Sequence, residues 1–169
     1  MTTSLVMTLL GPDRPGLVEA VSTTVAEHGG NWLESRMSRL GGQFAGILRI
    51  ECPVDQADSL AANLRALSVK GLAVQVIAGA PVEAEPRTEV RIDVVGNDRP
   101  GIVRRLAAAI VAGGGNVEEL TTTLESAPMS GHPLFHATGR VSLRADADPS
   151  LLAAAIEDLG HDLSVQVER

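Results

Sequence analysis

Two short turns in the sequence combine residue types that can bind both charged ends of a small zwitterion. Glycine, aspartate, arginine and proline occur at identical spacing in Gly11–Leu17 and again in Gly96–Ile102. Glycine lets a backbone approach a ligand closely, and the N–H groups at the start of a following helix attract a carboxylate. The aspartate of each turn can accept a hydrogen bond from an ammonium group. The pattern therefore predicts non-covalent binding of a small molecule that carries both groups.

The two turns belong to a repeat that covers most of the chain. They lie 85 residues apart, and Gly29–Asn31 and Gly114–Asn116 keep the same offset. Further along, the offset becomes 91 residues, as it is from Phe44 to Phe135. The second copy must therefore hold extra residues within 125–133. A repeat of this length predicts two domains with one fold.

Periodicity and turn signals predict the elements that position each turn. In the first copy, alternating residues 4–10 predict a strand, and the turn leads into a helix with apolar residues four apart. Two strands, 32–40 and 44–52, are expected around Gly41–Gly42, followed by a second helix and a last strand at 72–77. The order βαββαβ, found twice, predicts an α+β protein with two ferredoxin-like antiparallel sheets. We expect domains at 1–79 and 88–169, joined by a linker at 80–87.

Each turn also has a purely structural interpretation. Asp13 and Asp98 are favoured N-caps, and Pro15 and Pro100 suit the first turn of a helix. Asn31 and Asn116 either add a donor and an acceptor for a ligand or only tolerate the left-handed backbone after glycine. If the turns do bind a ligand, the candidate residues are Gly11, Asp13, Arg14, Pro15, Gly16, Leu17 and Asn31 in the first copy, and Gly96, Asn97, Asp98, Arg99, Pro100, Gly101, Ile102 and Asn116 in the second.

Composition argues against several function classes. The net charge is −7, which disfavours direct binding to nucleic acid. No apolar run reaches the roughly 20 residues that span a bilayer, and the single Cys52 suits a reducing compartment, so we expect a cytoplasmic protein. We see no nucleophile–base pair and no cofactor loop, and Pro133 separates His132 from His136. The sequence therefore predicts a protein that is not an enzyme and needs no metal or cofactor.

The motifs resemble a known family. The Asp-Arg-Pro-Gly turn followed by Gly-Gly-Asn resembles the ACT domain in both halves of the chain. The stretches Leu40–Ile47, Ala127–Gly131 and Pro133–Phe135, together with the tandem arrangement, are similar to the glycine cleavage system transcriptional repressor family. This resemblance implies a regulator that responds to glycine or a similar amino acid. It also implies action on a protein partner, with a DNA-binding activator as the candidate, instead of direct DNA binding.

Two other roles remain open from the sequence. The chain could be the detached regulatory subunit of an enzyme of amino-acid or one-carbon metabolism. It could also be an enzyme itself, although no catalytic constellation supports that. In either regulatory role we expect a homodimer, because isolated sheets of this kind leave strand edges and a partly apolar face uncovered.

Overall fold

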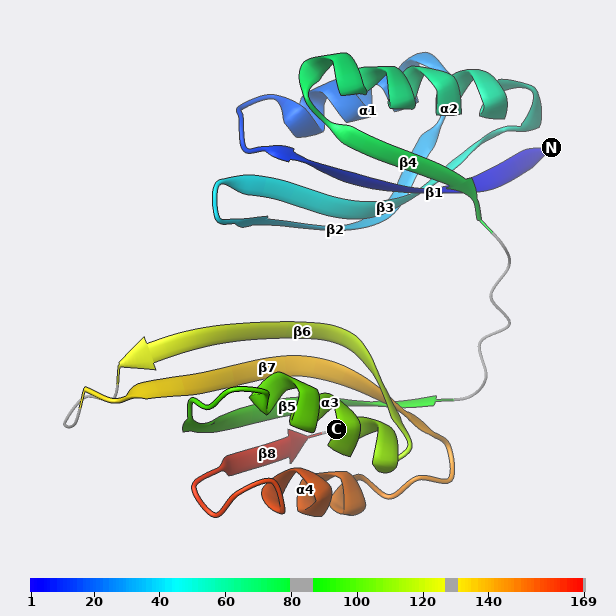
Figure 1. Ribbon diagram of the computed structural model, residues 1–169. Helices are drawn as coiled ribbons and strands as arrows, with labels where there is room; N and C mark the ends of the chain where they lie inside the picture. The colour runs from blue at the N-terminus through cyan, green and yellow to red at the C-terminus, as the bar shows by residue number, and fades with distance from the viewer. Residues whose placement is uncertain (80–86, 127–130, 169) are drawn as a thin grey trace. The chain divides into compact units, whose positions relative to one another are not determined.

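The computed structural model describes residues 1–79, 87–126 and 131–168. They form two compact units, here called unit 1 and unit 2, which lie on either side of segment 80–86 in the sequence (Figure 1). Most of the expected linker 80–87 falls outside the described residues, and its last residue, Arg87, is the first residue of a strand. No helix in the described ranges is long and apolar enough to cross a membrane.

Unit 1 is a four-stranded antiparallel sheet with two helices. The strand order is β2-β3-β1-β4, which is the ferredoxin-like arrangement that the repeat predicted. Short 3-10 turns flank the second helix. The elements are β1 (Thr2–Pro12), α1 (Leu17–Glu27), β2 (Asn31–Leu40), β3 (Gln43–Pro53), α2 (Ala57–Ala66) and β4 (Ala73–Ala78).

Unit 2 repeats this topology with the strand order β6-β7-β5-β8. Its elements are β5 (Arg87–Asn97), α3 (Ile102–Ala112), β6 (Gly115–Ser126), β7 (Pro133–Arg144), α4 (Pro149–Glu157) and β8 (Ser164–Glu168). The two-residue hairpin at Gly41–Gly42, where both φ angles are positive, is replaced in unit 2 by a longer connection from Ser126 to Pro133. The motif Ala127–Gly131 lies mainly outside the described residues.

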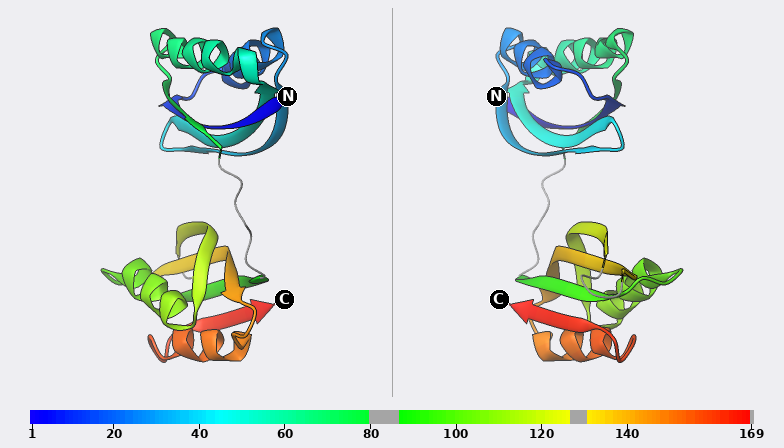
Figure 2. Two further views of the ribbon diagram at one scale, coloured as in Figure 1. Left: turned by 90° about the vertical axis from the view of Figure 1, so that its right-hand side faces the viewer. Right: turned by 90° about the vertical axis from the view of Figure 1, so that its left-hand side faces the viewer.

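The core of each unit lies between the sheet and its two helices. Strand alternation buries Leu5, Met7 and Leu9 in β1, and Val90, Ile92 and Val94 in the matching β5. Figure 2 shows that both helices of a unit cover the same face of its sheet. The apolar stripes of the helices therefore pack on one sheet face and leave the other face open.

The open sheet faces of the two units carry different side chains. In unit 1, Leu10, Ile47 and Ile77 are between 49% and 64% exposed on this face. At the corresponding positions of unit 2 the residues are Val95, Thr138 and Glu168. The repeat has therefore kept the same core while the two open faces have become chemically distinct.

The expected helix starts were wrong in both copies. Helices α1 and α3 begin after Gly16 and Gly101, and neither has a side-chain N-cap hydrogen bond. Both glycines have left-handed φ angles, 87° and 81°, which residues with a Cβ rarely adopt. Asp13, Pro15 and their counterparts therefore lie before the helix and do not cap it. By contrast, Asp148 caps helix α4 with its side chain, because its carboxylate accepts from Ser150 N at 2.9 Å.

Candidate ligand site

The turn of unit 2 borders a surface hollow of about 410 Å³. One side is formed by the turn and the first residues of α3, and the other by strand β6. Phe135, which is 3% exposed, forms part of the floor. The lining residues are Asp98, Arg99, Pro100, Gly101, Ile102, Val103, Thr122, Thr123, Leu124 and Phe135.

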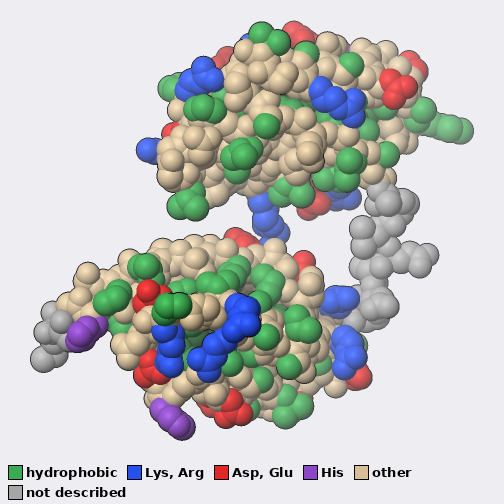
Figure 3. All heavy atoms as spheres, viewed as in Figure 1, with side chains coloured by type: hydrophobic (Ala, Val, Ile, Leu, Met, Phe, Trp, Pro, Cys, Tyr) green, Lys and Arg blue, Asp and Glu red, His purple; other side chains and the backbone are tan. Residues whose placement is uncertain are grey.

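The N-terminus of α3 lies at this hollow. The first N–H groups of a helix have no partner within the helix. In α3 the Ile102 N–H donates to the Arg99 carbonyl at 3.1 Å, but no side chain caps the N–H groups of Val103 and Arg104. They add to the positive end of the helix dipole, which attracts a carboxylate. Figure 3 shows basic side chains gathered over α3 and the turn before it, where the sequence has Arg99, Arg104 and Arg105. Arg99 is neutralised by an ion pair with Asp162, so the helix dipole together with Arg104 and Arg105 favours an anionic group here.

Asp98 supplies the opposite charge. Its backbone N–H donates to the carbonyl of Pro133 at 3.0 Å, which holds the turn against the start of β7. Within the described residues, its carboxylate has no hydrogen bond or ion pair. The group is exposed at the edge of the hollow and is available to accept from an ammonium group.

The corresponding aspartate of unit 1 is already paired. Arg39 Nε lies 3.0 Å from Asp13 Oδ2, and the Asp13 N–H donates to the carbonyl of Gly42 at 2.9 Å. At the repeat offset of 85 residues, the position of Arg39 is taken in unit 2 by Leu124, which is 63% exposed. A single difference between the copies thus removes the cation that engages Asp13 and leaves Asp98 free.

The arginines of both turns are engaged within their own unit. Arg14 Nη2 donates to the Lys70 carbonyl at 2.5 Å. Arg99 forms an ion pair with Asp162, and the other oxygen of that carboxylate accepts from the Asn97 N–H at 3.2 Å. These arginines fix the turn to the loop before the last strand, so ligand binding is not their first role.

The glycines at the start of the two motifs also serve packing. A Cβ on Gly11 would come within 2.7 Å of the Gly71 carbonyl oxygen, and one on Gly96 would collide with Leu163. Gly11 and Gly96 therefore let the last strand pack closely against the first. A valine at Gly16 or Gly101, where φ is positive, would mainly test backbone strain.

The asparagines do not join the turn of their own unit. Asn31 pairs with Glu51 in the sheet register, whereas the turn follows the end of β1 that pairs with Gln43. Asn116 pairs with Ser142 and donates to Glu118 at 3.1 Å. Both asparagines lie at the opposite end of the sheet from the turn.

Sequence reasoning missed the β6 wall of the hollow, which is formed by Thr122, Thr123 and Leu124. The available signal was the repeat itself, since aligning Leu124 with Arg39 reveals an apolar-for-basic difference beside the turn. The sequence alone does not show that this difference lies beside the ligand site. The strand register shows it, because residue 124 pairs with Phe135.

Comparison with known proteins identifies the class to which this fold and these turns correspond. Residues 3–76 match the family model of the ACT domain. Unit 2 has the same strand order and the same turn as unit 1. The chain therefore consists of two tandem ferredoxin-like units, of which the first matches the ACT domain.

The resemblance extends over nearly the full length. The chain is 27% identical to the glycine cleavage system transcriptional repressor of Escherichia coli (strain K12), with 96% of this chain and 86% of that protein covered. A crystal structure of an unknown protein from Galdieria sulphuraria has a TM-score of 0.86 at 26% identity, covering 99% of this chain and 98% of that one. A second crystal structure, of a protein provisionally named glycine cleavage system transcriptional repressor, has a TM-score of 0.72 at 18% identity and shows the same fold over 100% and 99% of the two chains. This chain of two ferredoxin-like units therefore resembles the glycine cleavage system transcriptional repressor over nearly its full length.

Proposed function

We propose that this protein is a non-enzymatic regulator that binds a small amino acid, such as glycine, at the turn of unit 2. The observation that carries the proposal is that two groups lie at the edge of one hollow. They are the Asp98 carboxylate, which has no partner within the described residues, and the N-terminus of α3, which has no side-chain cap. These groups match the ammonium and carboxylate ends of an amino acid. The resemblance to a glycine cleavage system transcriptional repressor supports a regulatory role.

The walls of the hollow restrict the ligand further. Val103, Leu124 and Phe135 give one part of it an apolar lining, and Thr122 and Thr123 add hydroxyl groups. A short apolar or hydroxylated side chain suits this lining, whereas a charged one would be desolvated without a partner. We therefore propose glycine, alanine or serine as the ligand class.

We further propose that the regulator acts through a protein partner, with a DNA-binding activator as the first candidate, and not by contacting DNA. The net charge of −7 supports this, because phosphate backbones repel an acidic surface. We also propose a cytoplasmic homodimer. The exposed apolar side chains on the open face of unit 1 support association with another protein surface.

Calorimetric titration of the full chain with free amino acids tests the ligand proposal. Saturable binding of glycine, alanine or serine, and weaker binding of aspartate and lysine, is the expected result. Absence of heat with every small amino acid at millimolar concentration would remove the basis for an amino-acid response. A promoter-fragment mobility assay with the protein alone tests the partner proposal, and sequence-specific retardation would contradict it.

A further inference from the structure

The open sheet face of unit 2 has a second hollow, of about 320 Å³, away from the turn. All four strands contribute to it. Its lining residues are Arg91, Ile92, Asp93, Glu119, Thr121, Thr138, Gly139, Arg140, Gln166 and Glu168. Most of its lining residues are polar or charged, and none of them lines the hollow at the turn.

A row of four charged residues crosses this face. The strand registers pair Glu119 with Arg140, Arg140 with Arg91, and Arg91 with Glu168. Two arginines therefore lie directly opposite each other on the central strands, with a glutamate on each outer strand. Like charges in this arrangement destabilise a sheet unless each is neutralised.

Only one of these two arginines is neutralised by the described residues. Arg140 Nε lies 3.0 Å from Glu119 Oε2, and its Nη1 lies 3.4 Å from Glu89 Oε1. Arg91 has no hydrogen bond or ion pair to any residue in the described ranges. It is an exposed guanidinium on a central strand, beside a cavity, with its planar set of donors free.

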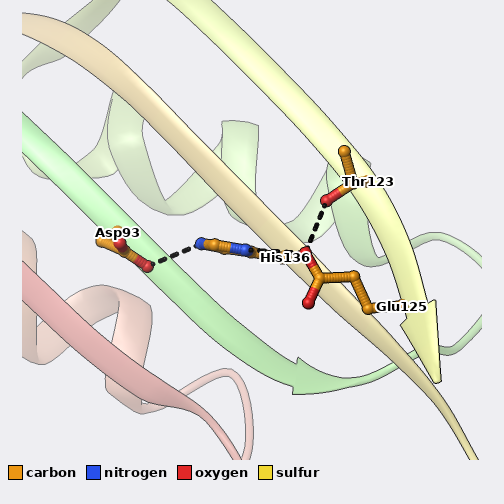
Figure 4. A network of polar contacts seen from close by, with 4 residues as sticks. All are labelled: Asp93, Thr123, Glu125 and His136. Atoms are coloured by element: carbon orange, nitrogen blue, oxygen red, sulfur yellow. Dashed lines mark hydrogen bonds and ion pairs between the residues drawn. The ribbon is translucent and has the colours of Figure 1, made fainter. Parts of the chain in front are cut away.

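The adjacent row of residues across the four strands carries neutral and acidic hydrogen-bonding groups. Thr121 pairs with Thr138, Thr138 with Asp93, and Asp93 with Gln166. One oxygen of Asp93 is engaged by His136 Nε2 at 3.0 Å, in the network with Glu125 and Thr123 that Figure 4 shows. The carboxylate of Glu168, like that of Asp98, is unpaired within the part of the chain that the structure describes.

Unit 1 shows that the fold does not require these groups. At the offsets of the repeat, Arg91, Thr138 and Glu168 correspond to Val6, Ile47 and Ile77. The open face of an ACT domain can thus be built with apolar residues at the same sheet positions. Arg91 and Glu168 are therefore an addition to a face that folds without them, whereas the Glu119–Arg140 ion pair has a counterpart in Glu34 and Arg49 of unit 1.

We propose that this hollow is a second binding site, independent of the turn, for a small molecule that carries a carboxylate and an ammonium group. Arg91 binds the carboxylate through its free donors, and Glu168 accepts from the ammonium group. Thr138 and Gln166 line the hollow beside these two groups, so their backbone amides report on its occupation. A simple anion is disfavoured, because Glu168, Glu119 and Asp93 surround the arginines with negative charge.

Residue-resolved NMR titration of the full chain with glycine tests this site separately from the turn. Acetate and methylamine, which each carry one of the two groups, serve as matched probes. Saturable shifts of the Thr138 and Gln166 amides with glycine, and much weaker ones with either half-probe, are expected. Equal affinity for acetate and glycine would overturn the assignment, as would the absence of any saturable shift at these two amides.

A second experiment repeats the glycine titration on a variant in which a residue of the hollow is replaced by its unit 1 counterpart. Arg91→Val, which places the unit 1 residue in the same kind of strand position, should weaken glycine binding at Thr138 and Gln166 by about tenfold or more. Shifts of the Gly101 and Thr122 amides at the turn should remain. Arg36→Val, on the open face of unit 1, is the control and should change neither set. Unchanged binding at Thr138 in Arg91→Val would refute the site.

Discussion

Arg99 in the turn before α3 forms an ion pair with Asp162, which precedes β8, and the same carboxylate accepts from the Asn97 N–H at 3.2 Å. In unit 1, Gly71 stands at the position of Asp162, and Arg14 donates instead to the neighbouring Lys70 carbonyl at 2.5 Å. Each turn is thus tied by its arginine to the loop before the last strand. The arginine positions the turn, and the aspartate beside it remains for other contacts.

The contacts of Asp162 predict a loss of stability in acid. Burial acts to raise the pKa of this carboxyl, but hydrogen bonds from Arg99 and from the backbone N–H groups of Asp162 and Asn97 outweigh it and lower the pKa below its ordinary value. A pKa lowered by folding stabilises the protein above the ordinary pKa, and this contribution is lost as the pH falls through the folded value. Asp162→Asn should therefore flatten the acid limb of the unfolding free energy against pH.

Urea unfolding at a series of acid pH values measures this effect. Asp158→Asn, which removes an equal charge from the same loop region, is the control and should retain the wild-type slope. An Asp162→Asn variant with an unchanged acid limb would show that the ion pair does not persist in solution.

His136 should titrate above its ordinary pKa. The hydrogen bond with the Glu125 carboxylate is the largest cause of the rise, burial opposes it, and Asp93 adds to it (Figure 4). Because folding raises this pKa above its ordinary value, the stabilisation is complete below the unfolded pKa and is lost as the pH rises through the folded pKa. NMR titration of the imidazole signals should show a lower pKa in Glu125→Gln. Glu157→Gln is the control, and an equal decrease in both variants would contradict the direct contact.

We expect glycine to be needed at position 101 because of its positive φ angle, and not because a side chain would collide with neighbouring atoms. Its φ is 81°, and a Cβ at this position would have no atom of the described residues within 4 Å beyond its immediate chain neighbours. Gly101→Ala should therefore cost about 1 kcal/mol in unfolding free energy, from the left-handed conformation alone. Gly101→Asn should cost less, because asparagine tolerates this region. Equal losses in the two variants, measured by chemical denaturation, would indicate a steric cause.

Much of the fold could be predicted because its signals are local. Alternation of apolar residues in β1 and β5 identified the buried faces, and the repeat fixed the element order in both copies. The helix starts were misplaced because aspartate and proline suit an N-cap as well as a turn. Only the positive φ of Gly16 and Gly101 decides between these possibilities, and that angle is set by how the strand, turn and helix pack.

The candidate site was less predictable because its contacts join distant residues. The motif identified Asp98 and Gly101, but the β6 wall depends on the pairing of Leu124 with Phe135 across the sheet. The engagement of Asp13 by Arg39 is likewise a contact across the unit. The two turns have nearly identical sequences, yet the aspartate is paired in unit 1 and unpaired in unit 2. The residue that causes this difference lies on a neighbouring strand, outside the motif.

The central claim is that the free Asp98, and not the paired Asp13, receives the ammonium group of an amino acid. Calorimetric titration of glycine into the wild type, Asp98→Asn and Asp13→Asn tests it most directly, because the two substitutions are chemically identical and lie at matching positions. Residue-resolved shifts at Gly101 and Thr122 assign the measured binding to the turn. We predict that Asp98→Asn weakens binding there by about tenfold or more, while Asp13→Asn changes it by less than about twofold. Equal effects of the two substitutions, or a loss of binding in Asp13→Asn alone, would contradict this account.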